Sequence, residues 1–315
     1  MCRIVFLFFL LILFPNGLLN AQKGTGKRYR IDRYESIYLP LGKISFADSL
    51  VAFKVGSPVP VQKYRDSMQC LHEPDYKNYQ TPNFTSLGCG GSLTVAFTDN
   101  GFMNLPGDDL YLFEVGPSKE PAKVEISENG ADWVYAGTIS GGKSAIDLSA
   151  EGIDSETVFY FLRVTDLKDL CKSKSAGADL DAIGAINSVI KLSIGADVLF
   201  DVAKFDLKES AKHRLDSLTK TIQKVDKATL LIEGHTDSDG DEISNMVLSE
   251  NRCVAVKNRL IEIFGEDSLY EFEVKAYGES RPRFANNSDS NKQQNRRVEI
   301  TVLPPKDYYE NLSKK

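Results

Sequence analysis

The residues best suited to bind a small charged ligand lie in one short segment, 233–252. An acidic loop that contains Asp237 follows an apolar run and precedes a helical pattern, and such a loop offers backbone N–H groups and a partial positive charge to a carboxylate. The residues that follow are spaced by 3, 1 and 3, so they share one flank of a helix: Asn245, Leu248, Ser249 and Arg252. Asp237 is an anion, and Arg252 can grip a carboxylate through two parallel hydrogen bonds. The pair indicates a ligand with an ammonium and a carboxylate group on one carbon.

The second half of the chain contains the elements that must position this segment. Apolar residues recur at helical steps in 207–225 and 246–263, and the second helix is expected to end at Gly265. Four strands are predicted, at 197–201, 228–236, 270–277 and 297–303. The order strand, helix, strand, helix, strand, strand is typical of an α/β unit in which helices pack on one sheet.

Several separated motifs in this half resemble the OmpA-like family in order and spacing. They are Gly234-His-Thr-Asp237 with Gly240, Asn245, Leu248-Ser249 and Arg252, then Tyr277 to Pro282, Asn286-Asn287 and Asn295 to Ile300. The resemblance extends over residues 195–303. It implies a βαβαββ fold that binds the stem peptide of peptidoglycan.

The resemblance also implies roles for single residues. Asp237 and Arg252 would hold the free amino-acid end of diaminopimelate. The residues expected to line or support the pocket are Phe200, Asp201, Thr236, Asn245, Leu248 and Arg296. The structural alternative is that Asp237 caps the following helix and Arg252 forms an ion pair within the protein. Arg297 is expected to be solvated or paired.

The first half of the chain has short apolar runs that alternate with polar residues, separated by turn sequences such as Asp99-Asn100-Gly101. This pattern predicts an all-β sandwich over residues 22–190, including a linker at its end, before the OmpA-like domain at 191–303 and a polar tail at 304–315. Three segments faintly resemble jelly-roll surface domains: Gly90 to Val95, Asp109 to Glu114 and Gly177 to Ile183. A transmembrane β-barrel is the architectural alternative, but most of the runs are shorter than the roughly 9–11 residues that a barrel strand needs.

Residues 1–21 have the pattern of a secretory signal peptide, with Arg3, an apolar run from Ile4 to Phe14 and a small residue at Ala21. That run is shorter than the roughly 20 residues of a membrane-spanning helix. Without residues 1–21 the formal net charge falls from −6 to −7, because Arg3 is the only charged residue among them. An acidic chain of this kind argues against nucleic acid as a partner.

Export permits disulfides, and one is expected among Cys70, Cys89 and Cys171. The spacing does not decide which two pair. Cys253 lies on the apolar stripe of a predicted helix, so it is expected to be a buried, inert thiol.

Other chemistries fit the sequence less well. The loop at Asp237 lacks the glycine and glutamate positions of an EF-hand, and His72, His213 and His235 are not spaced as zinc ligands. His235 is expected to be a satisfied structural group. Calcium in the N-terminal domain is the one metal considered, held by aspartates at strand ends and loops: Asp99, Asp108, Asp109, Asp179 and Asp181.

These observations together predict a binding protein without catalytic residues. It would anchor itself noncovalently to peptidoglycan in the periplasm, at the outer membrane, while its N-terminal domain meets an outer-membrane protein or a glycan. The alternatives are a surface adhesin or glycan-binding protein whose activity lies in the N-terminal domain, a porin-like barrel, and a wall hydrolase that uses a pair of carboxylates.

Overall fold

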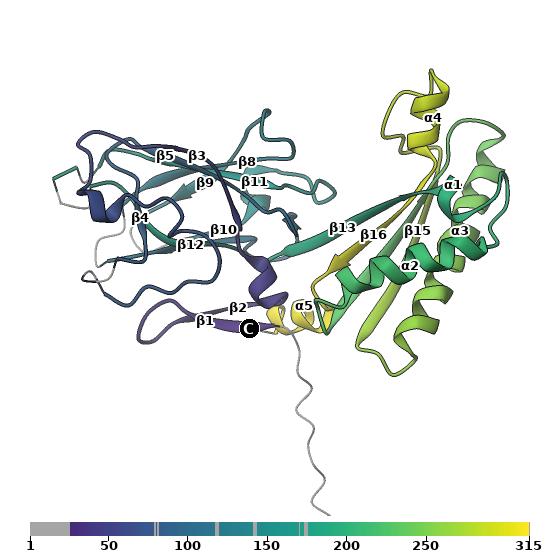
Figure 1. Ribbon diagram of the computed structural model, residues 1–315, viewed down its shortest axis with the longest axis horizontal. Coiled ribbons are helices and arrows are strands. Elements are labelled where there is room, and N and C mark those ends of the chain that lie inside the picture. The colour runs from purple at the N-terminus through teal and green to yellow at the C-terminus, as the bar shows by residue number, and fades with distance from the viewer. Residues whose placement is uncertain are drawn as a thin grey trace, which may run out of the picture.

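The computed structural model describes residues 26–314, except 79, 81, 117–119, 141–143, 170 and 173–175. The predicted signal peptide, 1–21, lies outside the described residues. An all-β region and a mixed α/β region lie side by side, and strand β13 (Ser188–Gly195) runs from the first into the second (Figure 1). Among the helices that are described, none is long and apolar enough to cross a membrane.

Two antiparallel sheets form most of the N-terminal region. The five-stranded sheet has the order β3 (Ser49–Lys54), β5 (Ser92–Ala96), β11 (Phe161–Asp166), β8 (Ala122–Ser127) and β9 (Val134–Ile139). The four-stranded sheet has the order β10 (Ala145–Ile146), β7 (Leu110–Glu114), β12 (Asp179–Ala185) and β4 (Thr85–Ser86). Beside them are a hairpin of β1 (Lys27–Arg30) and β2 (Ser36–Leu39) and the 3-10 helices η1 (Gly42–Ser45), η2 (Gln62–Tyr64) and η3 (Leu148–Glu151).

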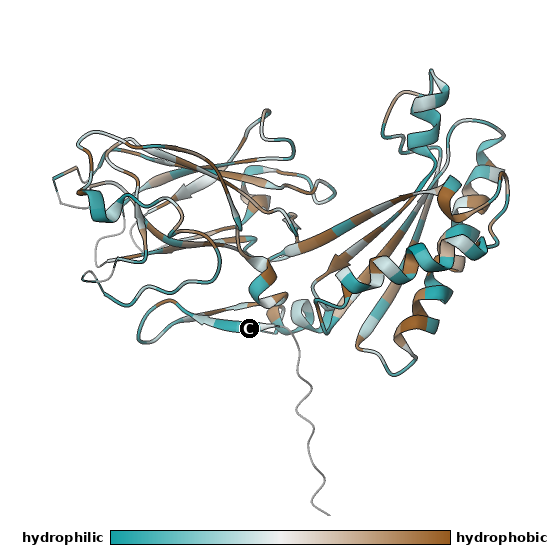
Figure 2. Ribbon diagram, viewed as in Figure 1, coloured by the Kyte–Doolittle hydropathy of each residue, from teal (hydrophilic) through white to brown (hydrophobic). Residues whose placement is uncertain are grey.

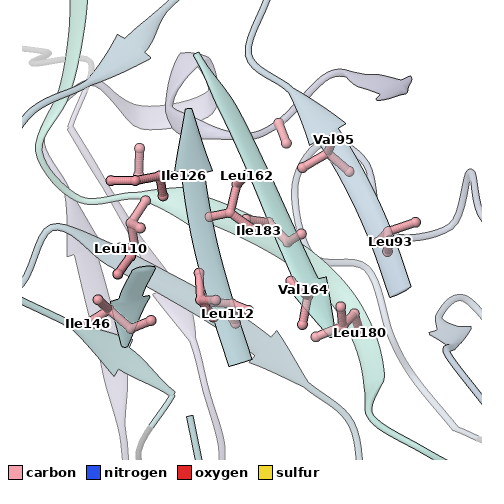
Figure 3. Packing of buried hydrophobic residues seen from close by; sticks show 14 of the residues in the cluster. Leu93, Val95, Leu110, Leu112, Ile126, Ile146, Leu162, Val164, Leu180 and Ile183 are labelled. Atoms are coloured by element: carbon pink, nitrogen blue, oxygen red, sulfur yellow. The ribbon is translucent and has the colours of Figure 1, made fainter. Parts of the chain in front are cut away.

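The alternating sequence pattern directs one face of each sheet into a shared core. Buried and partly exposed residues alternate along β11, and its Val164 and Leu162 lie opposite Val124 and Ile126 of β8. Figure 3 shows side chains of this cluster, with Leu93, Val95, Ile126, Leu162 and Val164 from one sheet and Leu110, Leu112, Ile146, Leu180 and Ile183 from the other. Two sheets over one core is the packing that a sandwich requires. The jelly-roll resemblance stays a prediction.

One disulfide joins Cys89 to Cys171, with a Cα–Cα distance of 5.4 Å, while Cys70 and Cys253 are free and buried. This confirms a single bridge among the three N-terminal cysteines and a buried thiol at Cys253. The bridge closes a long loop between segments that are 82 residues apart, so it restricts the unfolded chain.

The C-terminal region is a five-stranded sheet with its two long helices packed on one side (Figure 1). Its order is β15 (Tyr270–Gly278), β14 (Ala228–His235), β16 (Arg297–Leu303), β13 and β6 (Gly101–Phe102). Strands β14 and β15 are parallel, and the other neighbours are antiparallel. The helices are α1 (Ala196–Leu199), α2 (Glu209–Ile222), α3 (Glu242–Phe264), α4 (Asp289–Asn295) and α5 (Lys306–Leu312).

The predicted apolar stripes of the two long helices are the faces that they bury. Helix α2 turns Ala211, Leu215 and Ile222 into the core, and α3 turns Cys253, Val256 and Leu260 into it. Both helices and the strands at 228–236, 270–277 and 297–303 are thereby confirmed to within a few residues. Helix α4, which has no apolar stripe and is hydrophilic throughout (Figure 2), was not predicted.

The predicted strand at 197–201 is wrong. The strand is β13, which ends at Gly195, and it is followed at once by the single helical turn α1. Ala196 and Leu199 are both buried and lie three residues apart, so a helical turn directs both into the core, whereas a strand would direct them to opposite faces.

The predicted tail at 304–315 contains helix α5, which packs on the N-terminal region. The Tyr309 hydroxyl donates a hydrogen bond to Asn187 Oδ1 at 3.0 Å, and the ring of Tyr308 lies 5.8 Å from that of Tyr38 in β2. Two tyrosines in a polar segment give no helical period, so the sequence did not reveal this contact.

The two regions share packing as well as strand β13. Leu41 precedes η1 and Ile44 lies in it. Both belong to the hydrophobic cluster of the C-terminal region, together with Leu199, Leu215 and Ile300. The short strand β6 extends the C-terminal sheet by pairing with β13. The C-terminal sheet and its core are therefore completed by residues from the first half of the chain.

We expect Leu41→Ala to lower the free energy of unfolding by about 2–5 kcal/mol, because Leu41 is fully buried in the C-terminal core. Far-UV circular dichroism during urea unfolding measures this through the helices. Tyr34→Ala, at a side chain that is 88% exposed, is the control and should change the value by no more than about 0.5 kcal/mol. Equal stability of the two variants would show that η1 is not part of that core.

Candidate functional site

A pocket of about 330 Å³ lies where β14 ends and α3 begins. Six of the eight residues predicted for the site line it: Thr236, Asp237, Asn245, Leu248, Arg252 and Arg296. Its wall also contains residues that the sequence did not single out: Asp197, Val202, Ala203 and Asp239. The pocket thus draws on α1 and the loop after it, the loop 236–241, α3, and the residue before β16.

Close packing and hydrogen bonds fix the loop that carries Asp237. Gly234 has no Cβ, and a Cβ there would lie 2.5 Å from the carbonyl oxygen of Ser249, so glycine allows β14 to approach α3. The Thr236 N–H donates to the Gly278 carbonyl at 2.8 Å. The Asn245 amide donates to the carbonyls of Asp237 and Asp239, each at 3.2 Å, and to Glu279 at 2.7 Å. Asn245 therefore supports the shape of the loop.

Asp241, and not Asp237, caps helix α3. Its side chain accepts a hydrogen bond from the Ser244 N–H at 2.9 Å. The structural alternative for Asp237 as the helix cap is therefore wrong. The carboxylate of Asp237 remains in the pocket wall.

Asp237 is paired with Arg296. Arg296 Nη1 lies 2.5 Å from Asp237 Oδ2, and the other edge of the same guanidinium binds both oxygens of Asp197, at 3.2 and 3.1 Å. The hydrogen bonds that Arg296 donates to Asp197 are the main cause that raises the pKa of Arg296 above its usual range, and the same bonds lower the pKa of Asp197. Arg296 therefore bridges two carboxylates at the pocket mouth.

Arg252 is buried and has no ion-pair partner among the described residues. Its Nε donates to the Lys204 carbonyl at 3.0 Å, and its guanidinium carbon lies 5.2 Å from the centre of the Phe200 ring. In the part of the chain that the structure describes, its two terminal nitrogens have no hydrogen-bond partner. Burial lowers the pKa of Arg252, but an arginine stays charged in a protein. The proposed structural ion pair of Arg252 is therefore wrong.

Arg252 has no carboxylate within ion-pair distance in the described chain, and only the more distant charges of Asp197 and Asp237 favour its charged form, so it can bind a further anion. Removing a charge from water costs roughly several kcal/mol unless hydrogen bonds and an opposite charge offset the loss. Its two terminal nitrogens match the two oxygens of a carboxylate. The hydroxyl of Thr236 also lacks a partner in the described structure, and it lines the same pocket.

The two remaining predicted residues do not line the pocket. Phe200 is buried, and the face of its ring packs against the guanidinium of Arg252. Asp201 is exposed, and its carboxylate lies 3.5 Å from Lys208 Nζ. Asp197 was overlooked because the expected strand gave no reason for its side chain to face a residue 99 positions away.

The opposite face of the sheet carries a second polar cluster, around His235. This histidine is 4% exposed, stacks on Tyr277 at 5.3 Å, and neither ring nitrogen has a hydrogen-bond partner in the described structure. The prediction of a satisfied structural histidine is therefore wrong. Arg297 is paired with Glu299 at 2.7 Å, one of its two expected states. Both residues border a cleft of about 620 Å³ that faces the N-terminal loop Met103–Gly107.

The N-terminal aspartates do not gather around a cation site. Asp109 accepts hydrogen bonds from the N–H groups of Leu105 and Leu148 and from Asn187, at 2.7 to 2.9 Å. Asp181 accepts from two backbone N–H groups, and Asp99 lies 3.5 Å from Lys224 Nζ. No cluster of three acidic, histidine or cysteine side chains suited to a metal occurs among the described residues. The buried aspartates hold loops in place.

Burial and the nearby Arg297 lower the pKa of His235 from 6.5 to about 4. A histidine with a lowered folded-state pKa stabilises the fold above pH 6.5, and this contribution is lost as the pH falls from 6.5 to about 4. We therefore expect His235→Phe, which keeps the ring stacked on Tyr277, to reduce the acid sensitivity of stability by up to roughly 3 kcal/mol. Urea unfolding of both proteins near neutral pH and near pH 4 measures the difference. Parallel losses of stability in the two proteins would contradict a neutral, buried His235.

The chain is similar in sequence to known proteins of the bacterial outer membrane and cell wall. A model of the OmpA family matches residues 199–296. Outer membrane porin F of Pseudomonas aeruginosa is 33% identical over 225 residues, or 69% of this chain and 60% of that protein. The peptidoglycan-associated lipoprotein of Pseudomonas putida is 33% identical over 125 residues, or 39% of this chain and 74% of that protein. The solved cell wall anchor of the T6SS from Pseudomonas aeruginosa is 28% identical, covering 38% of this chain and 85% of that chain with a TM-score of 0.33. The chain spans 57% to 65% of the length of the first curated relatives.

Proposed function

The chain belongs to the OmpA family, and from this premise we propose that it is an exported envelope protein that anchors itself to the cell wall by binding peptidoglycan. The ligand would be the stem peptide, held noncovalently at the pocket between β14 and α3 through the free amino-acid end of diaminopimelate. The names of the relatives support an envelope location, in the periplasm at the outer membrane.

The observation that carries the proposal is the unpaired guanidinium of Arg252. Most of this side chain is buried, and its two terminal nitrogens reach the pocket without an acceptor in the described chain. A ligand carboxylate would provide both the charge and the two acceptors. The ammonium group on the same carbon would then lie near Asp237, which lines the same pocket.

We propose binding without bond cleavage. A carboxylate-pair hydrolase needs one carboxyl group that holds a proton and one that does not. Both pocket carboxylates at the mouth, Asp197 and Asp237, are bonded to Arg296, and the pKa of Asp197 is lowered. Such groups are suited to holding cations.

The N-terminal β region would meet a different partner, either an outer-membrane protein or a glycan. Exposed apolar side chains on and after the edge strand β3 favour a protein: Val51, Val55, Val59 and Val61 are 37% to 52% exposed. An adhesin whose activity lies in this region remains the second candidate, and it is supported by the same surface.

Cosedimentation of the purified chain with insoluble peptidoglycan tests the proposal. We expect Asp237→Asn and Arg252→Gln each to weaken binding roughly 10- to 150-fold, the equivalent of about 1.5–3 kcal/mol for a charge-assisted hydrogen bond. Arg252→Gln should still fold, because it breaks no ion pair within the described chain. Circular dichroism and urea unfolding check the fold.

Matched controls separate the pocket from general charge effects. Asp241→Asn keeps the helix cap, and Arg259→Gln changes an arginine two turns along α3 that pairs with Asp216 outside the pocket. Both controls should sediment as the wild type does. Wild-type protein left in the supernatant, or equal losses in controls and pocket variants, would contradict the proposal.

A further inference from the structure

We propose that Asp197 makes the pocket selective for ligands that carry an ammonium group beside the carboxylate. The inference rests on the proposed function, since it assigns a specificity-determining role at the same site. Asp197 would act through Arg296 and would not touch the ligand. It is therefore a positioning residue.

Asp237 is already bonded within the protein. Asp237 is the anion available to a ligand ammonium, yet its Oδ2 already accepts a hydrogen bond from Arg296 at 2.5 Å. A ligand ammonium must therefore share Asp237 with a protein guanidinium. The strength of the Asp237–Arg296 pair then decides how much the ammonium group adds to binding.

Asp197 competes with Asp237 for the same guanidinium. It holds Arg296 through two bonds, from Nε at 3.2 Å and from Nη2 at 3.1 Å, whereas Asp237 holds it through one. Two parallel bonds fix both the position and the plane of a guanidinium. Asp197 therefore fixes the position of Arg296, whose single charge is shared between Asp197 and Asp237.

The backbone maintains this arrangement. The Ala196 N–H donates to the Arg296 carbonyl at 2.8 Å, so the residue before Asp197 is tied to the backbone of Arg296. Lys208 Nζ donates to the Asp197 carbonyl at 2.8 Å and anchors the same helical turn. Backbone contacts at Ala196 and at Asp197 itself therefore hold the turn that presents the Asp197 carboxylate to Arg296.

Replacing Asp197 with asparagine keeps the shape of the side chain and removes its charge. Arg296 would then have Asp237 as its one ion-pair partner in the cluster, and that pair would tighten. A ligand ammonium would meet a neutralised carboxylate and lose its attraction, whereas a ligand carboxylate at Arg252 would be unaffected or favoured.

Isothermal titration calorimetry of the purified chain with meso-diaminopimelate and with pimelate tests this role. The two probes share a carbon chain and two carboxylates, and only the first has ammonium groups. We expect Asp197→Asn to reduce the preference for meso-diaminopimelate about tenfold, the size typical of coupling within one ion-pair network. Asp216→Asn is the charge-matched control, because Asp216 pairs with Arg259 outside the pocket, and it should leave the preference unchanged.

A double-mutant comparison shows whether Asp197 acts through Arg296. In an Arg296→Gln background, Asp197→Asn should change the preference less than about twofold, because the shared guanidinium is gone. Equal changes in both backgrounds would mean that Asp197 meets the ligand directly, and no change in either would remove its role; both results overturn the inference. A wild-type chain that binds neither probe nor peptidoglycan would instead overturn the proposed function and this inference with it.

Discussion

Arg252, on α3, is buried and has no carboxylate within ion-pair distance in the described chain. Such an arrangement costs a folded protein stability unless a ligand supplies the opposite charge. The surrounding elements keep it so. Phe200 lies against the guanidinium, the Lys204 carbonyl takes its Nε, and Arg296 occupies the nearest aspartates. Each nearby anion is directed elsewhere, and the terminal nitrogens of Arg252 remain open to the pocket.

The construction of the C-terminal sheet links this pocket to the rest of the molecule. Strand β13 belongs to the sheet that carries the site and is paired at its start with β6 from the N-terminal region (Figure 1). Leu41 of the N-terminal region packs into the C-terminal core, and helix α5 of the C-terminal region bonds to Asn187 of the N-terminal region. If the pocket grips the wall, a load on the N-terminal region reaches it through a continuous strand and buried side chains, and not through a flexible linker.

The sequence predicted those features that depend on residues close together in the chain. The stripes of α2 and α3, the alternation of β16 and the motif around Asp237 are properties of neighbouring residues, and six of the eight predicted site residues meet in one pocket. Asp197 and Arg296 are far apart in sequence, so their pairing had no local signal. The apolar run at 197–201 fits one helical turn as well as a strand. The unpartnered ring of His235 follows from how β14, Tyr277 and Arg297 pack, which periodicity does not report.

A crystal structure of the chain with a bound diaminopimelate-containing muropeptide would show whether Arg252 binds the ligand. We expect the free carboxylate of the ligand about 3 Å from both terminal nitrogens of Arg252 and the neighbouring ammonium beside Asp237. A ligand bound in the cleft beside His235, or an Arg252 that pairs with a protein carboxylate while the ligand lies elsewhere, would contradict it.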